Sequence, residues 1–167
     1  DYKIKEGKIY REIVNEARSW QAGLIIAGTH GASGFEEFWA GSNANKIVSA
    51  TDLPVITIRG GVDIERDLNT IVMPIDSTPE TRQKTQVTAE LAAYFDAEVH
   101  VLALHTTNIS AVRDLVDSYA RQVIGFLKDD GIKCRLEKLN AINLTRETID
   151  YAIKVDANLI AIMTEQE

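Results

Sequence analysis

The sequence is poor in cysteine, in basic side chains and in long apolar runs. Its one cysteine, Cys134, excludes an intrachain disulfide framework and fits a reducing compartment, so we expect a cytoplasmic protein. No apolar run approaches the ~20 residues that a membrane-spanning helix needs. The opening segment DYKIKEGKIY also lacks the pattern of a signal peptide. We therefore expect no membrane partner.

The shortage of positive charge argues against nucleic acid as a partner. The chain has 18 Lys and Arg against 25 Asp and Glu, which gives a formal net charge of −7. Binding to a phosphate backbone needs a basic stripe. Here the basic residues are scattered singly, except for RQK at 82–84, which we interpret as a solvated helix face.

Histidine is also scarce, and its placement does not favour a metal site. His100 and His105 are five residues apart on one expected strand, so their side chains should lie on opposite faces. A metal site needs convergent ligands. We therefore expect structural roles for both.

Strand patterns alternate with helical patterns along the chain. Apolar or β-branched runs predict buried strands at 23–28, 53–59, 70–76, 98–104 and 158–163, and an alternating run predicts an edge strand at 133–139. Helices are expected at 8–20, from Ser77, from Ser110 to Gly131, and at 144–155. The helix from Ser77 should have a capping box with Glu80 and bury Val87, Leu91, Ala92 and Phe95. This alternation predicts an α/β fold, an open parallel sheet with helices on both faces.

An internal repeat appears when the chain is compared with itself. At an offset of 135, residues 11–30 align with 146–165, with seven identities in twenty positions. Both copies read as a helix followed by a buried strand, which favours duplication. The predicted domains are therefore 1–60, the C-terminal half of a first unit, then a linker at 61–69. The remainder, 70–167, is a second unit that lacks its last helix and strand.

A glycine-rich stretch, GTHGASGFEEFWAGSN, follows the apolar run LIIA. A buried strand followed by a glycine-rich turn and a helix suits anion binding, because helix N-terminal N–H groups lack partners. Gly28 and Gly31 should adopt φ > 0 and approach a ligand closely. Ser42 is a good N-cap whose hydroxyl is also suited to a phosphate, and Asn43 adds an amide donor. On glycine spacing alone, an ordinary strand-to-helix connection remains the alternative.

The motif G-x2-G-x9-G-S at residues 28–42 closely resembles that of the universal stress protein family. The likeness extends to DLPVITIR after the short helix and to LNTIVMPIDSTPETR, which is similar to the start of a second unit. The resemblance implies an adenine nucleotide alpha-hydrolase-like sheet of order 3-2-1-4-5. It also implies an adenine nucleotide, ATP with or without Mg²⁺, at the carboxyl ends of the strands.

The same resemblance assigns roles to particular residues. An Asp that ends strand 1 contacts the nucleoside in the family, and Asp76 holds that position in the second unit. The strand from Leu53 to Arg59 corresponds to the strand through which family members commonly pair, so we expect self-association there. The glycine loop contributes residues around the ribose and phosphates, namely Gly28, Gly31, Gly41, Ser42 and Asn43, with Thr29 and His30 at the rim.

Departures from the family pattern keep other functions open. Ala32 stands where many members have Arg or Lys, and Glu36 and Glu37 lie inside the loop. The glycine motif and Asp76 also belong to different units, so neither unit has a complete site. A ligand-free scaffold for protein association is one alternative. A slow ATP hydrolase is another, although no activated nucleophile or paired acids are seen near the loop.

Overall fold

The computed structural model describes residues 2–28, 42–63 and 65–164. The chain divides into two compact units. The N-terminal unit comprises Asp1–Ile64 with Thr164–Glu167, and the C-terminal unit comprises Glu65–Met163. Each unit is described by itself below. In the described residues, no helix is both long enough and apolar enough to span a membrane.

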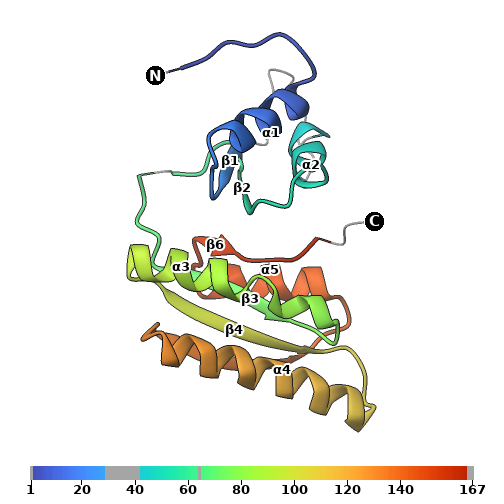
Figure 1. Cartoon of the computed structure of the whole chain (residues 1–167). Helices are drawn as coiled ribbons and strands as arrows, with labels where there is room; N and C mark the ends of the chain where they lie inside the picture. The colour runs from blue at the N-terminus through green and yellow to red at the C-terminus, as the bar shows by residue number, and fades with distance from the viewer. Residues whose placement is uncertain (1, 29–41, 64, 165–167) are drawn as a thin grey trace. The chain divides into compact units, whose positions relative to one another are not determined.

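The N-terminal unit contains two parallel strands and two helices (Figure 1). Helix α1 (Ile9–Ser19) precedes β1 (Ile25–Gly28), and α2 (Ser42–Val48) precedes β2 (Val55–Ile58). The two strands pair in parallel, with Ile25 opposite Val55 and Gly28 opposite Ile58. The helix expected at 8–20 and the strands within 23–28 and 53–59 are confirmed.

The start of α1 depends on Gly7. Its φ of +149° is unfavourable for other residues, and a Cβ there would lie 3.0 Å from the Glu12 side chain. Lys8 is the N-cap residue, and its side chain makes no capping hydrogen bond. Gly7 thus lets the chain turn into the helix while Glu12 folds back over it.

The burial expected for these two strands is wrong in part. Ile25 is buried, but the Ile26 side chain is 63% exposed, and β2 is mostly half-buried. Within the described residues this sheet has only two strands. Two strands and two short helices cannot cover both faces of a sheet, which explains why continuous apolar runs are left partly in solvent.

The C-terminal unit is a four-stranded parallel sheet with helices on both faces (Figure 1). The sheet order is β5-β4-β3-β6. Counting β3 as strand 1, this is the 3-2-1-4 part of the expected order, and the fifth position stays a prediction. The elements are β3 (Thr70–Ile75), the 3-10 helix η1 (Pro79–Arg82), α3 (Thr85–Phe95), β4 (Glu98–His105), α4 (Ser110–Asp129), β5 (Cys134–Asn140), α5 (Leu144–Lys154) and β6 (Leu159–Ile160).

Alternation along β3 and β4 separates two cores. Ile71, Met73 and Val101 pack with apolar residues of α3 and α4 on one face. Val72 and Leu102 pack with residues of α5 on the other face. All five of these side chains are fully buried. The expected layers are therefore confirmed, and β5, whose burial alternates, lies at the sheet edge as expected.

The helix after β3 differs from the expected one. The residue at the N-cap of η1 is Thr78 and not Ser77, and its side chain makes no capping hydrogen bond. Helix α3 begins only at Thr85. Phe95, expected in the core, is 47% exposed. Helix α3 instead buries mainly small side chains, Thr85, Thr88, Ala89 and Ala92.

The bounds of α1 and α5 differ by the same offset of 135 that the sequence repeat gave. Gln21 and Asp156, also 135 apart, both have positive φ, 52° and 53°. The next residue in each case donates its N–H to a carbonyl five residues back, Ala22 to Ala17 and Ala157 to Ala152, both at 2.9 Å. The repeat in sequence is therefore accompanied by a repeat in backbone conformation.

Candidate functional site

Half of the predicted site residues lie in the described part of the chain. Thr29, His30, Gly31 and Gly41 lie outside the described residues. Ser42 is the first residue of α2, and Asn43 is an exposed residue in its first turn.

Gly28 is the last residue of β1 and pairs with Ile58. The positive φ expected at Gly28 is wrong, since it is not among the residues with positive φ. A Cβ at this position would meet nothing within 4 Å. Strand pairing holds Gly28 in an extended conformation, so the described neighbours do not require a glycine there.

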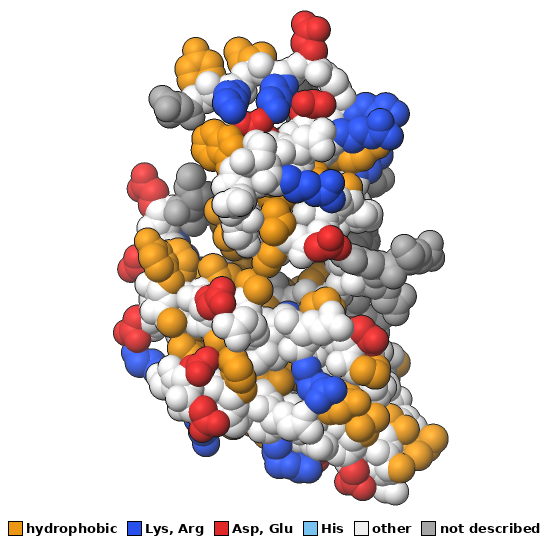
Figure 2. Space-filling model, in the orientation of Figure 1, with side chains coloured by type: hydrophobic (Ala, Val, Ile, Leu, Met, Phe, Trp, Pro, Cys, Tyr) orange, Lys and Arg blue, Asp and Glu red, His pale blue; other side chains and the backbone are white. Residues whose placement is uncertain are grey.

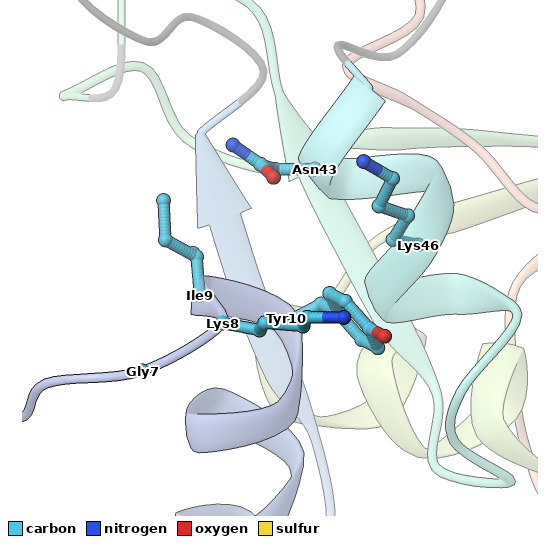
Figure 3. A pocket seen from close by; sticks show the side chains of 6 residues that line it. All are labelled: Gly7, Lys8, Ile9, Tyr10, Asn43 and Lys46. Carbon is cyan, nitrogen blue, oxygen red and sulfur yellow. The ribbon is translucent and has the colours of Figure 1, made fainter.

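A hollow of about 470 Å³ lies between the start of α1 and α2 (Figure 3). Residues 7–10, at the start of α1, line one side of the hollow. Asn43 and Lys46 of α2 also line it. The two helices pack against each other in the N-terminal unit. Asn43 is therefore the predicted site residue that the described structure places in a concave surface.

Two lysines give this hollow a positive character. Within the described residues, neither Lys8 nor Lys46 forms an ion pair. The neighbouring Lys3 and Lys5 are both engaged by Glu16, whose pKa falls to about 2 because of the hydrogen bonds from Lys3 and Lys5. On the face shown in Figure 2, Lys and Arg side chains lie over the N-terminal unit with Asp and Glu side chains among them.

Sequence reasoning missed Lys8 because it sought basic residues only between Arg18 and Lys46, around the glycine loop. The signal that could have found Lys8 is its position directly before α1, the helix that precedes β1 and the glycine motif. Helix-start residues from both sides of that strand meet at the hollow.

Asp76 directly follows β3 in the C-terminal unit. Its carboxylate accepts hydrogen bonds from the Thr78 N–H at 2.8 Å and the Thr78 hydroxyl at 2.6 Å. Its own N–H donates to the Thr81 hydroxyl at 3.2 Å. Asp76 therefore organises the turn into η1, and its expected contact with a nucleoside stays a prediction.

Lys84 overturns the interpretation of RQK as a solvated face. Its side chain is buried, and the ammonium donates to the Thr81 carbonyl at 2.7 Å. Burial lowers its pKa to about 8, although the charge of Asp76 acts in the opposite direction. Arg82 is not free either, since its guanidinium lies 4.1 Å from the centre of the Tyr119 ring. Lys84 precedes the buried Thr88 by one helical turn, which is the signal that sequence reasoning overlooked.

The two buried histidines lie on opposite faces of β4, as expected from their spacing. His100 Nδ1 lies 3.2 Å from the Tyr151 hydroxyl of α5. His105 Nε2 lies 2.9 Å from the carboxylate of Asp117 in α4. Among the described residues, no three His, Cys, Asp or Glu side chains are grouped as metal ligands. On β5, burial raises the pKa of the Cys134 thiol, which disfavours the reactive thiolate.

The family model described as the universal stress protein family matches residues 1–59. Over this segment the chain is similar to the universal stress protein family. No curated protein matches the chain at the sequence level.

Solved universal stress protein structures share the fold beyond that segment. A universal stress protein from Archaeoglobus fulgidus is 15% identical over 90% of this chain, with a TM-score of 0.63. A candidate universal stress protein from Pseudomonas aeruginosa is 17% identical over 93% of this chain, also at 0.63. This chain covers 52% of the first and 57% of the second, about half of each. A universal stress protein in complex with cAMP is 15% identical over 58% of this chain and 77% of its own, but its TM-score of 0.44 is too low to bear on the ligand here.

Proposed function

We propose that this universal stress protein segment binds an adenine nucleotide, ATP, as part of a stress response. The observation that carries the proposal is the spacing G-x2-G-x9-G-S directly after the parallel strand β1, inside the segment that the family model matches. Gly28, Ser42 and Asn43 lie on the described elements that flank the loop. Thr29, His30, Gly31 and Gly41 are proposed to complete the contacts to ribose and phosphates.

Mg²⁺ is proposed to accompany ATP. Glu36 and Glu37 in the loop would repel a bare triphosphate, whereas a bound divalent cation reverses the local charge balance. The role we propose is sensing or sequestering of the nucleotide, in the cytoplasm, rather than turnover.

The tandem organisation is also a proposal. It is supported by the matching bounds of α1 and α5 and by the roughly half-length coverage of longer relatives. Residues 1–60 would then be the end of one unit and 70–167 most of the next, with Asp76 as the strand-end Asp of the second. Self-association is proposed through the strand from Leu53 to Arg59, because β2 pairs with only one strand among the described residues.

Thermal unfolding with and without Mg-ATP tests the binding. A ligand at about 100 times its Kd should stabilise the protein by about 2.7 kcal/mol. Gly41→Val should abolish that shift, because a branched side chain would block close approach of the backbone. Gly23→Val is the matched control, since Gly23 is exposed and a Cβ there meets nothing within 4 Å.

Two results would contradict the proposal. The absence of any shift in the unaltered protein would favour a ligand-free scaffold. Release of phosphate during the incubation would favour the hydrolase.

A further inference from the structure

We propose that Lys8, Asn43 and Lys46 form a polyphosphate subsite in the hollow between α1 and α2. The group recognised is a chain of phosphates, either that of the nucleotide or a free polyphosphate. For the nucleotide, the inference rests on the function proposed above and names the groups that hold its charged end.

The three side chains come from two elements that the sequence separates by more than 30 residues. Lys8 lies at the N-cap of α1, and Asn43 and Lys46 lie one helical turn apart on α2. Residues three apart on a helix share a face. All three line the same hollow, which has a volume of about 470 Å³.

The charges around the hollow favour an anion. Its lining contains two lysines and no acidic side chain. Glu16, on the same helix as the lining residues 9 and 10, is already bound by Lys3 and Lys5. The carboxylate of Glu12 lies beside the lining residue Gly7, which places one negative charge next to the hollow. Lys8 and Lys46 outnumber it and have no ion-pair partner in the described structure.

A lysine side chain is better suited to binding a chain of phosphates than to binding one carboxylate held in a fixed position. Its ammonium is a compact charge with three donors on a flexible stem, so it can follow several phosphate oxygens. The side-chain amide of Asn43 adds an uncharged hydrogen-bond donor to the two lysine ammonium groups. Such a subsite does not distinguish bases, so its contribution should grow with the number of phosphates. It also supplies the positive charge that the loop lacks, with Ala32 where the family often has a basic residue.

Isothermal titration calorimetry on the full chain, with adenosine, AMP, ATP and tripolyphosphate as probes, tests the subsite. We expect Lys8→Gln/Lys46→Gln to weaken ATP and tripolyphosphate roughly tenfold, since two solvent-exposed ionic contacts are lost. Adenosine should bind unchanged. The control is Lys128→Gln/Lys154→Gln, which removes the same charge from exposed positions of the C-terminal unit. Equal unfolding temperatures of all variants establish that the folds are intact.

The outcomes separate the subsite from the proposed function. If ATP binds and the Lys8/Lys46 variant matches the control, the subsite is overturned and nucleotide binding stands. If tripolyphosphate binding depends on the two lysines and ATP binds no better than tripolyphosphate, the subsite stands and nucleotide recognition fails. If no probe binds the unaltered chain, both fail.

Discussion

Lys84 places an ammonium group where water scarcely reaches it. The group has the Thr81 carbonyl as a hydrogen-bond acceptor and Asp76 as a favourable charge, yet burial dominates and its pKa falls from 10.5 to about 8. In the unfolded chain the same lysine keeps its ordinary pKa. Between about pH 8 and 10.5 the unfolded state therefore binds more protons, and Lys84 makes the folded state relatively more stable as pH rises.

Lys84→Met should remove that pH dependence. At roughly 1.4 kcal/mol per pKa unit, the free energy of unfolding of the unaltered protein should rise by about 2 kcal/mol relative to the variant between pH 7 and pH 10. Urea unfolding at several pH values measures the difference. Lys128→Met, an exposed lysine of α4, is the control and should run parallel to the unaltered protein. Parallel curves for Lys84→Met as well would contradict the buried charge.

At this scale the sequence predicts residue types better than their surroundings. The opposite facing of His100 and His105 followed from their spacing. The burial of Lys84 did not follow from the sequence, because it depends on how the turn before α3 packs in the folded unit. The role proposed for Lys8 depends on a helix start that lies far from the motif in sequence.

At the scale of elements, four helices end in the same way. After α1, α3, α4 and α5 one residue adopts positive φ, and the N–H of the next residue bonds to a carbonyl five back. This left-handed ending was predicted only for α4, because only there is the residue with positive φ a glycine, Gly131. The other three use residues that rarely adopt this conformation, namely Gln21, Asp96 and Asp156.

Substitution at these helix ends should have opposite effects on stability. Gln21→Gly should stabilise α1 by about 0.5 to 1 kcal/mol, because glycine tolerates φ of 52° without strain. Gly131→Ala should destabilise the end of α4 by about 1 kcal/mol, since its φ is 73°. Amide hydrogen exchange in each helix measures both changes. The same direction of change in both would contradict a shared left-handed ending.

At the same scale, strand and helix bounds were predicted well and packing faces less well. Hydrophobic periodicity identified α1, α4 and α5 nearly to the residue, because each has one clear apolar side. The face of α3 was right for Ala92, which is buried, and for Leu91, which packs against the core, but wrong for Phe95. The buried Thr88 and Ala89 were missed because small side chains give a weaker signal. The predicted burial of Ile26 was wrong because the burial of a strand residue depends on the neighbouring strands and helices.

At the scale of the whole molecule, the two units have very different cores. In the N-terminal unit the fully covered apolar side chains of the described residues are few, Val14, Ile25, Ala44 and Ile47. The C-terminal unit buries apolar side chains on both faces of a four-stranded sheet. A two-stranded sheet with two short helices has little apolar surface to bury, whereas a four-stranded sheet with helices on both faces encloses a core on each side.

The asymmetry predicts that the units differ in independent stability. A fragment of residues 65–163 should unfold in one cooperative urea transition, since its sheet is covered by α3 and α4 on one side and α5 on the other. A fragment of residues 1–64 should show no such transition, because a two-stranded sheet with a small core is marginal in water. Circular dichroism in urea, with the full chain as reference, measures both. A sigmoidal transition in the 1–64 fragment would show that α1, β1, α2 and β2 suffice for a core, and would remove the reason to expect a partner strand at β2.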